Sequence, residues 1–472
     1  MERLKKVGHI VPKMSGEIKE SRVGLGLEKL DRNVFDPNKT YDKVAQLGVK
    51  WIRIQSGWER TEKAPGEYDF AWIDDIVNNL VDRGLIPWIC LCYGNPLYDD
   101  AAKVVYGSVG CPPIHTQEQK EAWDRYVRAV VERYRGKVPY YEVWNEPDGQ
   151  WCWKHGISAE EYGEFVVATS KAIRETDSQA KVIGGSYCHR SMHFIDTALK
   201  IMANHIDAIT FHEYTMDEYQ VFSRVKSLRA LIDLYNPSIE IIQGESGSQS
   251  RSGGAGALKV GAWTPRRQAK QLLRHTIADL LTEVKFMSFF SCVDMIEALR
   301  GERGVKSSYM DYGYFGVLGA DFDEDGFATG EYTPKPSYYA LQNISAVFAE
   351  EVKPAELPVI FCRKESPRIF DKDIAENQIL YGGFRKPNGS SALFFWIPAD
   401  LMKSEAESTI TLDIAALGEE IRLVDMMDGS VYELPESMVE NYGDGHLVLN
   451  NVPIRDYPMA LLFGAFADVQ GE

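Results

Sequence analysis

The chain alternates between two hydrophobic patterns from about residue 22 to residue 350. Short runs rich in β-branched and aromatic residues are typical of buried strands, and the segments between them place apolar residues at helical spacing. The predicted strands are 22–27, 50–55, 86–93, 138–145, 181–185, 207–214, 239–245 and 284–292. The predicted helices include 70–83, 117–135, 159–176, 217–235, 266–281 and 337–348. Eight strand–helix repeats predict the α/β class and a (β/α)₈ barrel, the TIM barrel.

The pattern changes after residue 350. Short runs are now separated by turn residues such as Asp428 and Gly429, which is typical of an antiparallel β-sandwich. The predicted strands there are 378–384, 391–396, 408–413, 421–426, 431–433, 446–449 and 459–463. We therefore expect a barrel domain at 22–352 and a β-sandwich accessory domain at 353–472, with an N-terminal segment, 1–21, able to add a strand to the sandwich.

Two glutamates stand where apolar strands stop. Glu146 follows the predicted strand 138–145, and Glu245 ends the predicted strand 239–245. Counting along the repeats puts them at the ends of strands 4 and 7, the end of a TIM barrel that carries chemistry. Two carboxylates held opposite each other are the minimum apparatus for hydrolysing a glycosidic bond. The pair therefore predicts an enzyme that cleaves sugars.

Charge and composition exclude some classes of binding partner. The 472 residues are 44% hydrophobic and 26% charged, as in an ordinary globular protein, and the net charge of -17 repels phosphate backbones and anionic membrane surfaces. No apolar run reaches the length of a membrane span. We expect a carbohydrate substrate and neither nucleic acid nor a membrane as partner, and the sequence leaves open whether the chain forms a homo-oligomer.

Cysteine usage points to a reducing compartment. The seven cysteines are an odd number without CxxC spacing, so free thiols are expected instead of a disulfide framework. The N-terminal stretch shows charged residues where a secretory signal would have its apolar region. These features predict a cytoplasmic protein.

Several motifs resemble clan A of the glycoside hydrolases. They are WNEPD at 144–148, GES at 244–246, FHEY at 211–214, YTPKPSYY at 332–339, and Arg53 on strand 2. Within the clan the chain looks most like family 39 and its β-xylosidase and α-iduronidase relatives. The resemblance implies retaining hydrolysis, with Glu146 as the general acid/base and Glu245 as the nucleophile. The structural alternatives are a helix-capping carboxylate for Glu146 and a turn carboxylate for Glu245.

Four further polar residues are candidates for the sugar site. Asn145 resembles the clan residue that hydrogen-bonds the sugar 2-OH, although it could also only fix the turn before Pro147. Inward alternation could bring Arg53 to Glu245 and hold that carboxylate ionised, or place it in a purely structural ion pair. His212 and Tyr214 share one face of strand 6 and could contact the sugar and Glu245, or be packed core residues.

Loop residues supply the remaining candidates for substrate binding. Aromatic side chains form platforms for the apolar faces of sugars, and Trp58, Trp151 and Trp153 lie in loops after strands 2 and 4. Asn95, after strand 3, could add a polar contact. Strand 8 departs from the clan, because the segment 288–292 lacks the tryptophan that many members place under the sugar.

No cofactor is predicted, and no metal. The turn 321–326 matches the first half of a calcium loop but lacks the closing glutamate, so a solvated acidic turn is expected. Cysteine and histidine spacings of the zinc type are not seen. The glycine-rich stretch 252–261 has no phosphate-binding signature and is interpreted as a mobile loop near the active site.

The leading functional prediction is a retaining, exo-acting β-glycosidase of the β-xylosidase type. The alternatives are action on uronic or galacto-configured sugars, endo-acting cleavage, and a non-catalytic carbohydrate-binding protein on the same fold. Arg300, Arg303 and Lys306 could reach an acidic substrate, although the sequence favours a solvated charge run for them.

Overall fold

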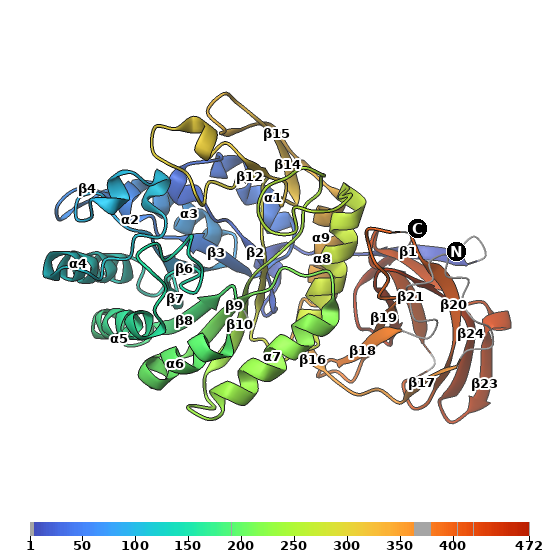
Figure 1. Ribbon diagram of the computed structural model, residues 1–472. Coiled ribbons are helices and arrows are strands. Elements are labelled where there is room, and N and C mark those ends of the chain that lie inside the picture. Colours follow the sequence, from blue (N-terminus) through green and yellow to red (C-terminus); the bar gives the residue numbers. More distant parts are fainter. Residues whose placement is uncertain (1–3, 190, 363–378, 404, 419, 472) are drawn as a thin grey trace.

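A closed barrel forms the first part of the molecule. The computed structural model describes residues 4–189, 191–362, 379–403, 405–418 and 420–471. In this described part, eight parallel strands close the barrel in the order β2-β3-β6-β7-β8-β9-β10-β11 (Figure 1). Their bounds are β2 (Val23–Gly26), β3 (Trp51–Gln55), β6 (Ile86–Leu91), β7 (Tyr140–Val143), β8 (Lys181–Tyr187), β9 (Ala208–His212), β10 (Glu240–Ser246) and β11 (Met287–Phe289). The predicted TIM barrel is confirmed.

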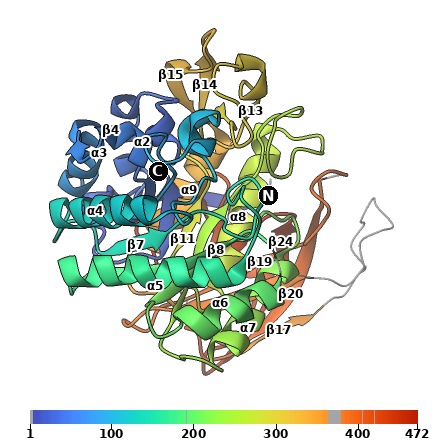
Figure 2. The same cartoon turned by 60° about the vertical axis from the view of Figure 1, so that its left-hand side comes forward.

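Helices surround the strands. They are α1 (Tyr41–Gln46), α2 (Trp58–Thr61), α3 (Ala71–Asp82), α4 (Gln117–Arg133), α5 (Ala159–Thr176), α6 (Met192–Met202), α7 (Glu218–Ile232), α8 (Pro265–Leu280) and α9 (Pro336–Val347). Figure 2 shows α4 and α5 side by side along the outer wall, with α6 next to α5. Each presents one apolar stripe to the strands, as the helical spacing of the sequence predicts. The structure adds α1, α2 and α6 to the helices expected from the sequence.

Capping residues begin the helices that follow the loops around the barrel mouth. The Thr116 hydroxyl accepts a hydrogen bond from the Gln119 backbone N–H at the start of α4, and the Gln119 side chain accepts one from the Thr116 N–H in return. The Thr264 hydroxyl accepts from the Arg267 backbone N–H at the start of α8, with Pro265 at the first helical position. Such side chains satisfy backbone donors that the first turn leaves without partners. The capping residues therefore fix where each long loop ends and its helix begins.

Side chains fill the barrel in layers. At the level where the strands begin, Trp88, Tyr140, Ile183, Ala208, Ile242 and Phe286 form a buried apolar cluster. Two residues farther along the strands the lining becomes polar, with Arg53, Glu142 and Thr210 all fully buried. Because alternate residues of a strand point inward, this polar layer lies on the side of the strands' C-terminal ends. It forms the base of the site described below.

Short hairpins stand between β11 and α9. They pair β12 (Met295–Ile296) with β13 (Tyr312–Gly313), and β14 (Leu318–Phe322) with β15 (Ala328–Pro334). A third hairpin, β4 (Glu62–Ala64) with β5 (Glu67–Tyr68), follows α2. The acidic turn 321–326 joins β14 to β15, where Asp323 accepts hydrogen bonds from the backbone N–H groups of Asp325 and Phe327.

Two antiparallel sheets form the second part of the molecule. One has the order β16-β18-β19-β25-β21-β22-β1-β26 and the other the order β17-β20-β24-β23. The bounds are β1 (Lys5–Ile10), β16 (Lys353–Pro354), β17 (Val359–Cys362), β18 (Leu380–Arg385), β19 (Ser391–Trp396), β20 (Glu407–Ile414), β21 (Ile421–Asp425), β22 (Ser430–Glu433), β23 (Val439–Gly443), β24 (His446–Arg455), β25 (Met459–Phe463) and β26 (Val469–Gly471). These sheets confirm the predicted sandwich. The expected strand 378–384 begins at residue 378, which lies outside the described residues.

The N-terminal strand β1 belongs to the sandwich although the barrel follows it in sequence. It pairs with β22 and β26, both close to the C-terminal end of the chain. On the barrel side, α8 and the start of α7 face the sandwich (Figure 1). The buried Arg274 of α8 forms an ion pair with Glu218 and donates to the Ala399 carbonyl at 2.7 Å. The division into independent domains at the expected boundaries stays a prediction.

Candidate active site

The candidate site lies at the C-terminal ends of the barrel strands, where β7, β9 and β10 stop. Glu146 follows β7 by three residues, and its backbone has a φ of +47°. Trp144, between the strand and Glu146, has a φ of +70°. Left-handed backbone at residues other than glycine is costly and concentrates at functional sites. Here the tight turn aims the Glu146 side chain across the barrel mouth.

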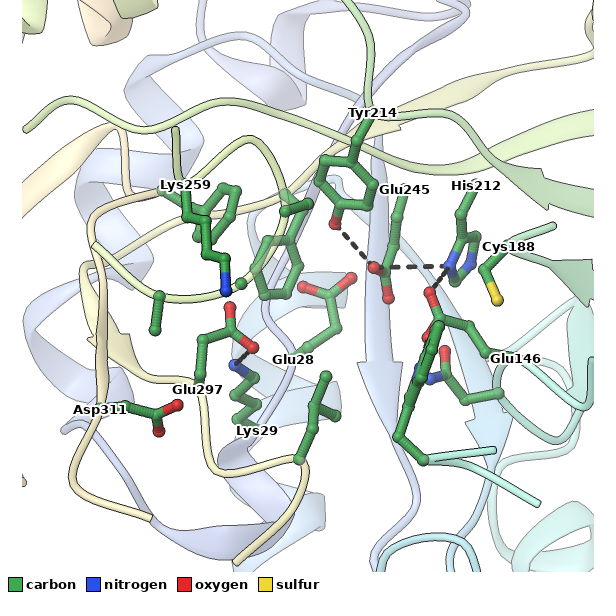
Figure 3. Close-up of a pocket in the computed structure, with 18 of the residues that line it drawn as sticks. Glu28, Lys29, Glu146, Cys188, His212, Tyr214, Glu245, Lys259, Glu297 and Asp311 are labelled. Atoms are coloured by element: carbon green, nitrogen blue, oxygen red, sulfur yellow. Dashed lines mark hydrogen bonds and ion pairs between the residues drawn. The ribbon is translucent and has the colours of Figure 1, made fainter. Parts of the chain in front are cut away.

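Glu146, His212 and Glu245 meet in the middle of this mouth (Figure 3). One polar atom from each lies within 4.8 Å of the corresponding atoms of the other two. The His212 Nδ1 atom is 2.8 Å from Glu146 Oε1 and 3.5 Å from Glu245 Oε2. Burial alone would lower the pKa of His212, but the charges of Glu245 and Glu146 raise it above the ordinary value. The imidazole therefore bridges two carboxylates.

The surroundings of Glu245 favour its ionised form. Tyr214 donates a hydrogen bond of 2.8 Å to Glu245 Oε2, and the Arg53 guanidinium binds Glu245 Oε1. Burial by itself would raise the pKa of Glu245, but His212, Arg53 and the Tyr214 hydrogen bond together lower it below the ordinary value. A carboxylate held this way stays deprotonated at neutral pH.

Arg53 lies beneath the site, in the polar layer of the barrel. Its Nε atom donates to Glu142 Oε2 at 2.8 Å, and its Nη2 atom donates to Asn145 Oδ1 at 2.8 Å. The side chain has no solvent exposure and reaches Glu245 from below, as the strand alternation predicts. It does not line the cavity, so its assignment to direct substrate binding is corrected: Arg53 holds Asn145 and Glu245 in position.

A cavity of about 1030 Å³ opens above the two glutamates. Its floor contains Asn145, Glu146, His212, Tyr214 and Glu245, so the structure brings these predicted residues together. Trp151 also lines it, and the indole N–H of Trp151 donates to Glu146 Oε2. Part of the wall comes from the glycine-rich stretch and from the segment after β11, including Ala255, Lys259, Leu299, Arg300, Asp311 and Tyr312. The loop expected near the active site is thus part of its wall.

Sequence reasoning missed several acidic residues of the cavity, including Glu28 and Glu297. Glu28 follows β2, and burial, reinforced by the charge of Glu245, raises the pKa of Glu28 to about 8. Among the described residues, Glu28 Oε2 has no hydrogen-bond partner. Glu297, after β11, forms an ion pair with Lys29 at 3.3 Å. Both glutamates follow barrel strands, so the strand-end rule that found Glu146 could have found them.

Phe290 lies where the sequence lacks the expected tryptophan. It is 5% exposed and lines the cavity together with Phe315, whose ring centroid is 5.3 Å away. The Lys29 ammonium lies 5.2 Å from the centre of the Phe290 ring. An aromatic side chain therefore remains at the end of strand 8, with a smaller ring than tryptophan.

Three predicted substrate contacts are corrected. Trp58 is 1% exposed and stacks between Tyr98 and Tyr126. Trp153 is fully buried against aromatic rings of α5, the helix that follows β7. Asn95 is 1% exposed and donates to the Glu62 carbonyl at 3.0 Å. These side chains pack within the loops beside the cavity and do not reach it. The sequence could not show this, because many of their neighbours come from segments that are distant along the chain.

The cations after β11 divide into two kinds. Arg303 forms an ion pair with Glu59 at 2.8 Å, and Lys306 forms one with Asp325, so both have protein partners outside the cavity. Arg300 does line the cavity, and its guanidinium carbon is 5.8 Å from the Trp151 ring centre. Only this member of the expected set is placed to meet a ligand.

Two general expectations concern thiols and membranes. Cys90, Cys92, Cys111, Cys152, Cys188 and Cys292 carry free thiols, while the side chain of Cys362 lies outside the described residues. Within the part of the chain that the structure describes, no helix combines the length and the apolar character needed to cross a bilayer.

Residues 38–231, which carry the barrel from before β3 to the end of α7, match the family model of glycosyl hydrolases family 39. The chain is a glycoside hydrolase that resembles family 39. The matched range includes Asn145, Glu146, His212 and Tyr214, and ends before Glu245. The resemblance seen in the sequence motifs is confirmed.

Solved structures share the complete architecture of this glycoside hydrolase. A monomeric β-xylosidase from Caulobacter crescentus CB15 superposes with a TM-score of 0.60 at 16% identity, covering 97% of both chains. An α-L-arabinofuranosidase from Thermotoga maritima gives 0.56 at 15% identity, covering 96% of this chain and 97% of that one. A family 30 xylanase from Clostridium acetobutylicum gives 0.52 at 10% identity, with 96% and 97% covered. At these identities the likeness concerns the fold.

Proposed function

We propose that the chain is a retaining, exo-acting β-glycosidase of the β-xylosidase type. The observation that carries the proposal is the separation of Glu146 and Glu245, whose nearest oxygens lie within 4.8 Å. Retaining glycosidases hold their two carboxyl groups ~5–5.5 Å apart, whereas inverting enzymes leave room for a water molecule and need ~6.5–9.5 Å. The short separation favours direct attack by one carboxylate on the sugar.

Glu245 is the proposed nucleophile, because its neighbours keep it ionised. Its oxygen forms a bond to the anomeric carbon as the bond to the leaving oxygen breaks, and the Glu146 carboxyl gives its proton to that oxygen. In the second step Glu146 takes a proton from water, and the water oxygen replaces Glu245 at the same carbon. The hydrogen bond of 2.8 Å from Tyr214 supports this assignment, since it steadies Glu245 before attack and as a leaving group.

The Glu146 side chain is held for its role by two neighbours. Trp151 donates to Oε2 and His212 contacts Oε1 at 2.8 Å. A general acid must point at the leaving oxygen, and two fixed contacts limit the rotation of the carboxyl group. The proposed acid/base and nucleophile therefore approach the substrate from different strands, β7 and β10.

Exo action and a pentose substrate rest on the cavity wall and on related folds. The glycine-rich stretch and the hairpins after β11 cover one side of the cavity, which supports a terminal sugar entering end-on. A volume of about 1030 Å³ suffices for one sugar and part of its leaving group. Solved structures with this architecture include a β-xylosidase and an α-L-arabinofuranosidase, which supports testing pentosides first.

A second candidate is a glycosidase for sugars that carry a carboxylate. Lys259 and Arg300 line the cavity, and among the described residues neither has an ion-pair partner. An acidic substrate group would supply one, as charge-assisted hydrogen bonds to carboxylates favour such cations. This alternative differs from the first only in substrate and uses the same two glutamates.

A panel of nitrophenyl glycosides tests both candidates. We expect the highest kcat/KM with the β-xyloside, compared with the β-galactoside, β-glucoside, α-arabinoside and β-glucuronide. Proton NMR of the first-formed sugar should show the anomeric configuration of the substrate. A preference for the glucuronide that is lost in Arg300→Gln would favour the second candidate, and an inverted first product would contradict the mechanism.

A further inference from the structure

A second cluster of metal-binding side chains lies outside the cavity, at Asp99, Cys111 and His155. One ligand atom of each lies within 4.8 Å of the ligand atoms of the other two. Asp99 and Cys111 belong to the long loop between β6 and α4, and His155 belongs to the loop between β7 and α5. None of the three lines the cavity above Glu146 and Glu245. Because His155 lies 44 positions after Cys111 in the sequence, spacing alone gives no sign of the cluster.

Each member has a ligand atom available. Asp99 uses Oδ1 to accept from the Ala101 backbone N–H at 2.9 Å, and among the described residues its buried Oδ2 has no hydrogen-bond partner. Its one close polar contact in the described part of the chain is with His155 Nε2, which lies 3.4 Å from this Oδ2. The thiol of Cys111 is 1% exposed and makes a single long contact of 3.9 Å, to the Val109 carbonyl. A buried carboxylate oxygen that makes no hydrogen bond is costly unless a cation satisfies it.

The chemistry of the set is that of a zinc ligand shell. A thiolate, an imidazole and a carboxylate oxygen are the three donor types that Zn²⁺ takes in proteins. The charges of one thiolate and one carboxylate balance a divalent ion. His115 packs edge-on against His155, with ring centroids 4.3 Å apart, which fixes the plane of the ligating ring.

We propose that Asp99, Cys111 and His155 bind a zinc ion, with a water molecule as the fourth ligand. On binding, the Cys111 S–H bond breaks, its proton passes to solvent and a zinc–sulfur bond forms, without any change of oxidation state. The site joins the loop after β6 to the loop after β7. That second loop also carries Trp151, four residues before His155, whose indole binds Glu146. Zinc would therefore brace the loop that holds the proposed acid/base.

The backbone already brings the two loops together. The Lys154 N–H donates to the Gly110 carbonyl at 2.9 Å, so the residues next to Cys111 and His155 are hydrogen-bonded. A preformed approach of this kind lowers the ordering cost of metal binding.

Cobalt(II) substitution of the full chain tests the proposal. After removal of bound metal with a chelator, titration with Co²⁺ should give the visible bands of tetrahedral cobalt and a near-ultraviolet thiolate-to-metal band, and Zn²⁺ should displace both. Glu146, His212 and Glu245 form another group with suitable donors, and Cys188 lines the cavity beside them. Variants must therefore distinguish the two places.

The thiolate band should disappear in Cys111→Ser and persist in Cys188→Ser, the matched control. His155→Ala should weaken Zn²⁺ binding by at least about tenfold, while His193→Ala, another exposed histidine, should leave it unchanged. If Cys111→Ser fails to fold, His155→Ala decides, because Zn²⁺ should raise the Tm of the His193→Ala protein and not of the His155→Ala protein. Absence of a thiolate band in the unmodified protein, its survival in Cys111→Ser, or equal zinc affinity in both histidine variants would overturn the proposal.

Discussion

At the scale of single residues, the carboxyl groups of the site differ in pKa because their surroundings differ. Glu245 has three stabilising neighbours and a lowered pKa, whereas Glu28 is buried with only a distant contact of 3.5 Å to Arg53 and has a pKa raised to about 8. At neutral pH the Glu28 carboxyl is therefore mostly protonated. Glu28 lines the cavity, and its Oε2 has no hydrogen-bond partner in the part of the chain that the structure describes. A neutral carboxyl group can donate a hydrogen bond to a sugar hydroxyl.

This arrangement predicts a basic limb in the pH profile. As pH rises through about 8, Glu28 loses its proton, the donor disappears and a second negative charge arises near Glu245, so kcat/KM should fall. Glu28→Gln keeps a neutral donor and should retain activity without this basic limb. Glu28→Leu should lose about tenfold in kcat/KM at neutral pH, the value of one hydrogen bond of ~1.4 kcal/mol. An unchanged basic limb in Glu28→Gln would exclude Glu28 as the titrating group.

Tyr214 provides a second test at this scale. Tyr214→Phe removes the hydrogen bond of 2.8 Å to Glu245 and leaves the ring packed against Phe290 and Phe315. We expect kcat to fall by about 10- to 100-fold, because a charge-assisted hydrogen bond contributes ~1.5–3 kcal/mol. Steady-state kinetics measure the change in kcat, and the Glu245→Ala variant gives the residual rate without the nucleophile. If Tyr214→Phe lowered only the Tm, Tyr214 would be a packing residue.

Sequence patterns revealed the residues of the site unevenly. Glu146, Glu245, His212 and Tyr214 could be predicted, because strand ends and two-residue alternation fix where these side chains point. The burial and the contacts of the loop residues could not be predicted in the same way. The positions of Trp58, Trp153 and Asn95 depend on loop segments folding over one another, which a local pattern does not contain. The same holds for the meeting of Asp99, Cys111 and His155.

At the scale of elements, the register of β9 against β10 brings His212 beside Glu245. The two residues are register partners, and an irregularity precedes Glu245 in β10. Gly244 lies at this irregularity, where an added Cβ would be 3.1 Å from His212 Nε2 and 3.2 Å from Thr210 Cβ. The close approach of strand and imidazole therefore requires a residue without a side chain.

Gly244→Ala should displace His212 and lower kcat/KM by about 10- to 100-fold, since small misplacements in a catalytic group are costly. Gly16→Ala is a suitable control, because its Cβ would meet nothing nearer than 3.5 Å. Thermal unfolding should change little in either protein. Equal kinetics for the two variants would show that β10 adapts and that the register does not determine the site.

The elements themselves were largely predictable. β19, β25 and α5 have the expected bounds, and the helices after β6 and β9 differ by a few residues at their ends. β24 runs to Arg455, well past the expected end at residue 449, because it pairs along its length with β20. Pairing partners, which lie far away in sequence, decide how far a strand extends.

At the scale of the whole molecule, a buried ion pair joins the barrel to the sandwich. Arg274 and Glu218 are 3% and 4% exposed as side chains, and Trp396 of β19 donates its indole N–H to Glu218 Oε1 at 3.2 Å. Lys270 of α8 also binds Asp456 of the sandwich at 2.7 Å. Removal of one partner leaves a buried charge without compensation.

Arg274→Ala should therefore lower the free energy of unfolding by about 3–5 kcal/mol. Arg266→Ala, on the exposed end of the same helix, removes a surface ion pair and a cation–π contact with Tyr457, and should change it by only about 1 kcal/mol. Denaturant titration followed by tryptophan fluorescence measures both. Similar values for the two variants would mean that the buried pair does not join the two parts.

The N-terminal strand gives a second prediction for the whole molecule. Because β1 pairs with β22 and β26, deletion of residues 1–21 should expose two strand edges of the sandwich and lower the Tm. Deletion of Val469–Gly471, which removes only the edge strand β26, should have a smaller effect. A Tm unchanged by the first deletion would show that the N-terminal segment is not part of the folding unit.

The central claim is that Glu245 forms a covalent bond to the sugar and Glu146 serves both steps as acid and base. The most direct test is the product that Glu146→Ala forms from a nitrophenyl β-glycoside in the presence of azide. The nitrophenolate leaves without an acid, the second step stalls without a base, and azide should then release the sugar from Glu245. Proton NMR should identify a β-glycosyl azide. An α-glycosyl azide, or no restoration of turnover by azide, would contradict the assignment.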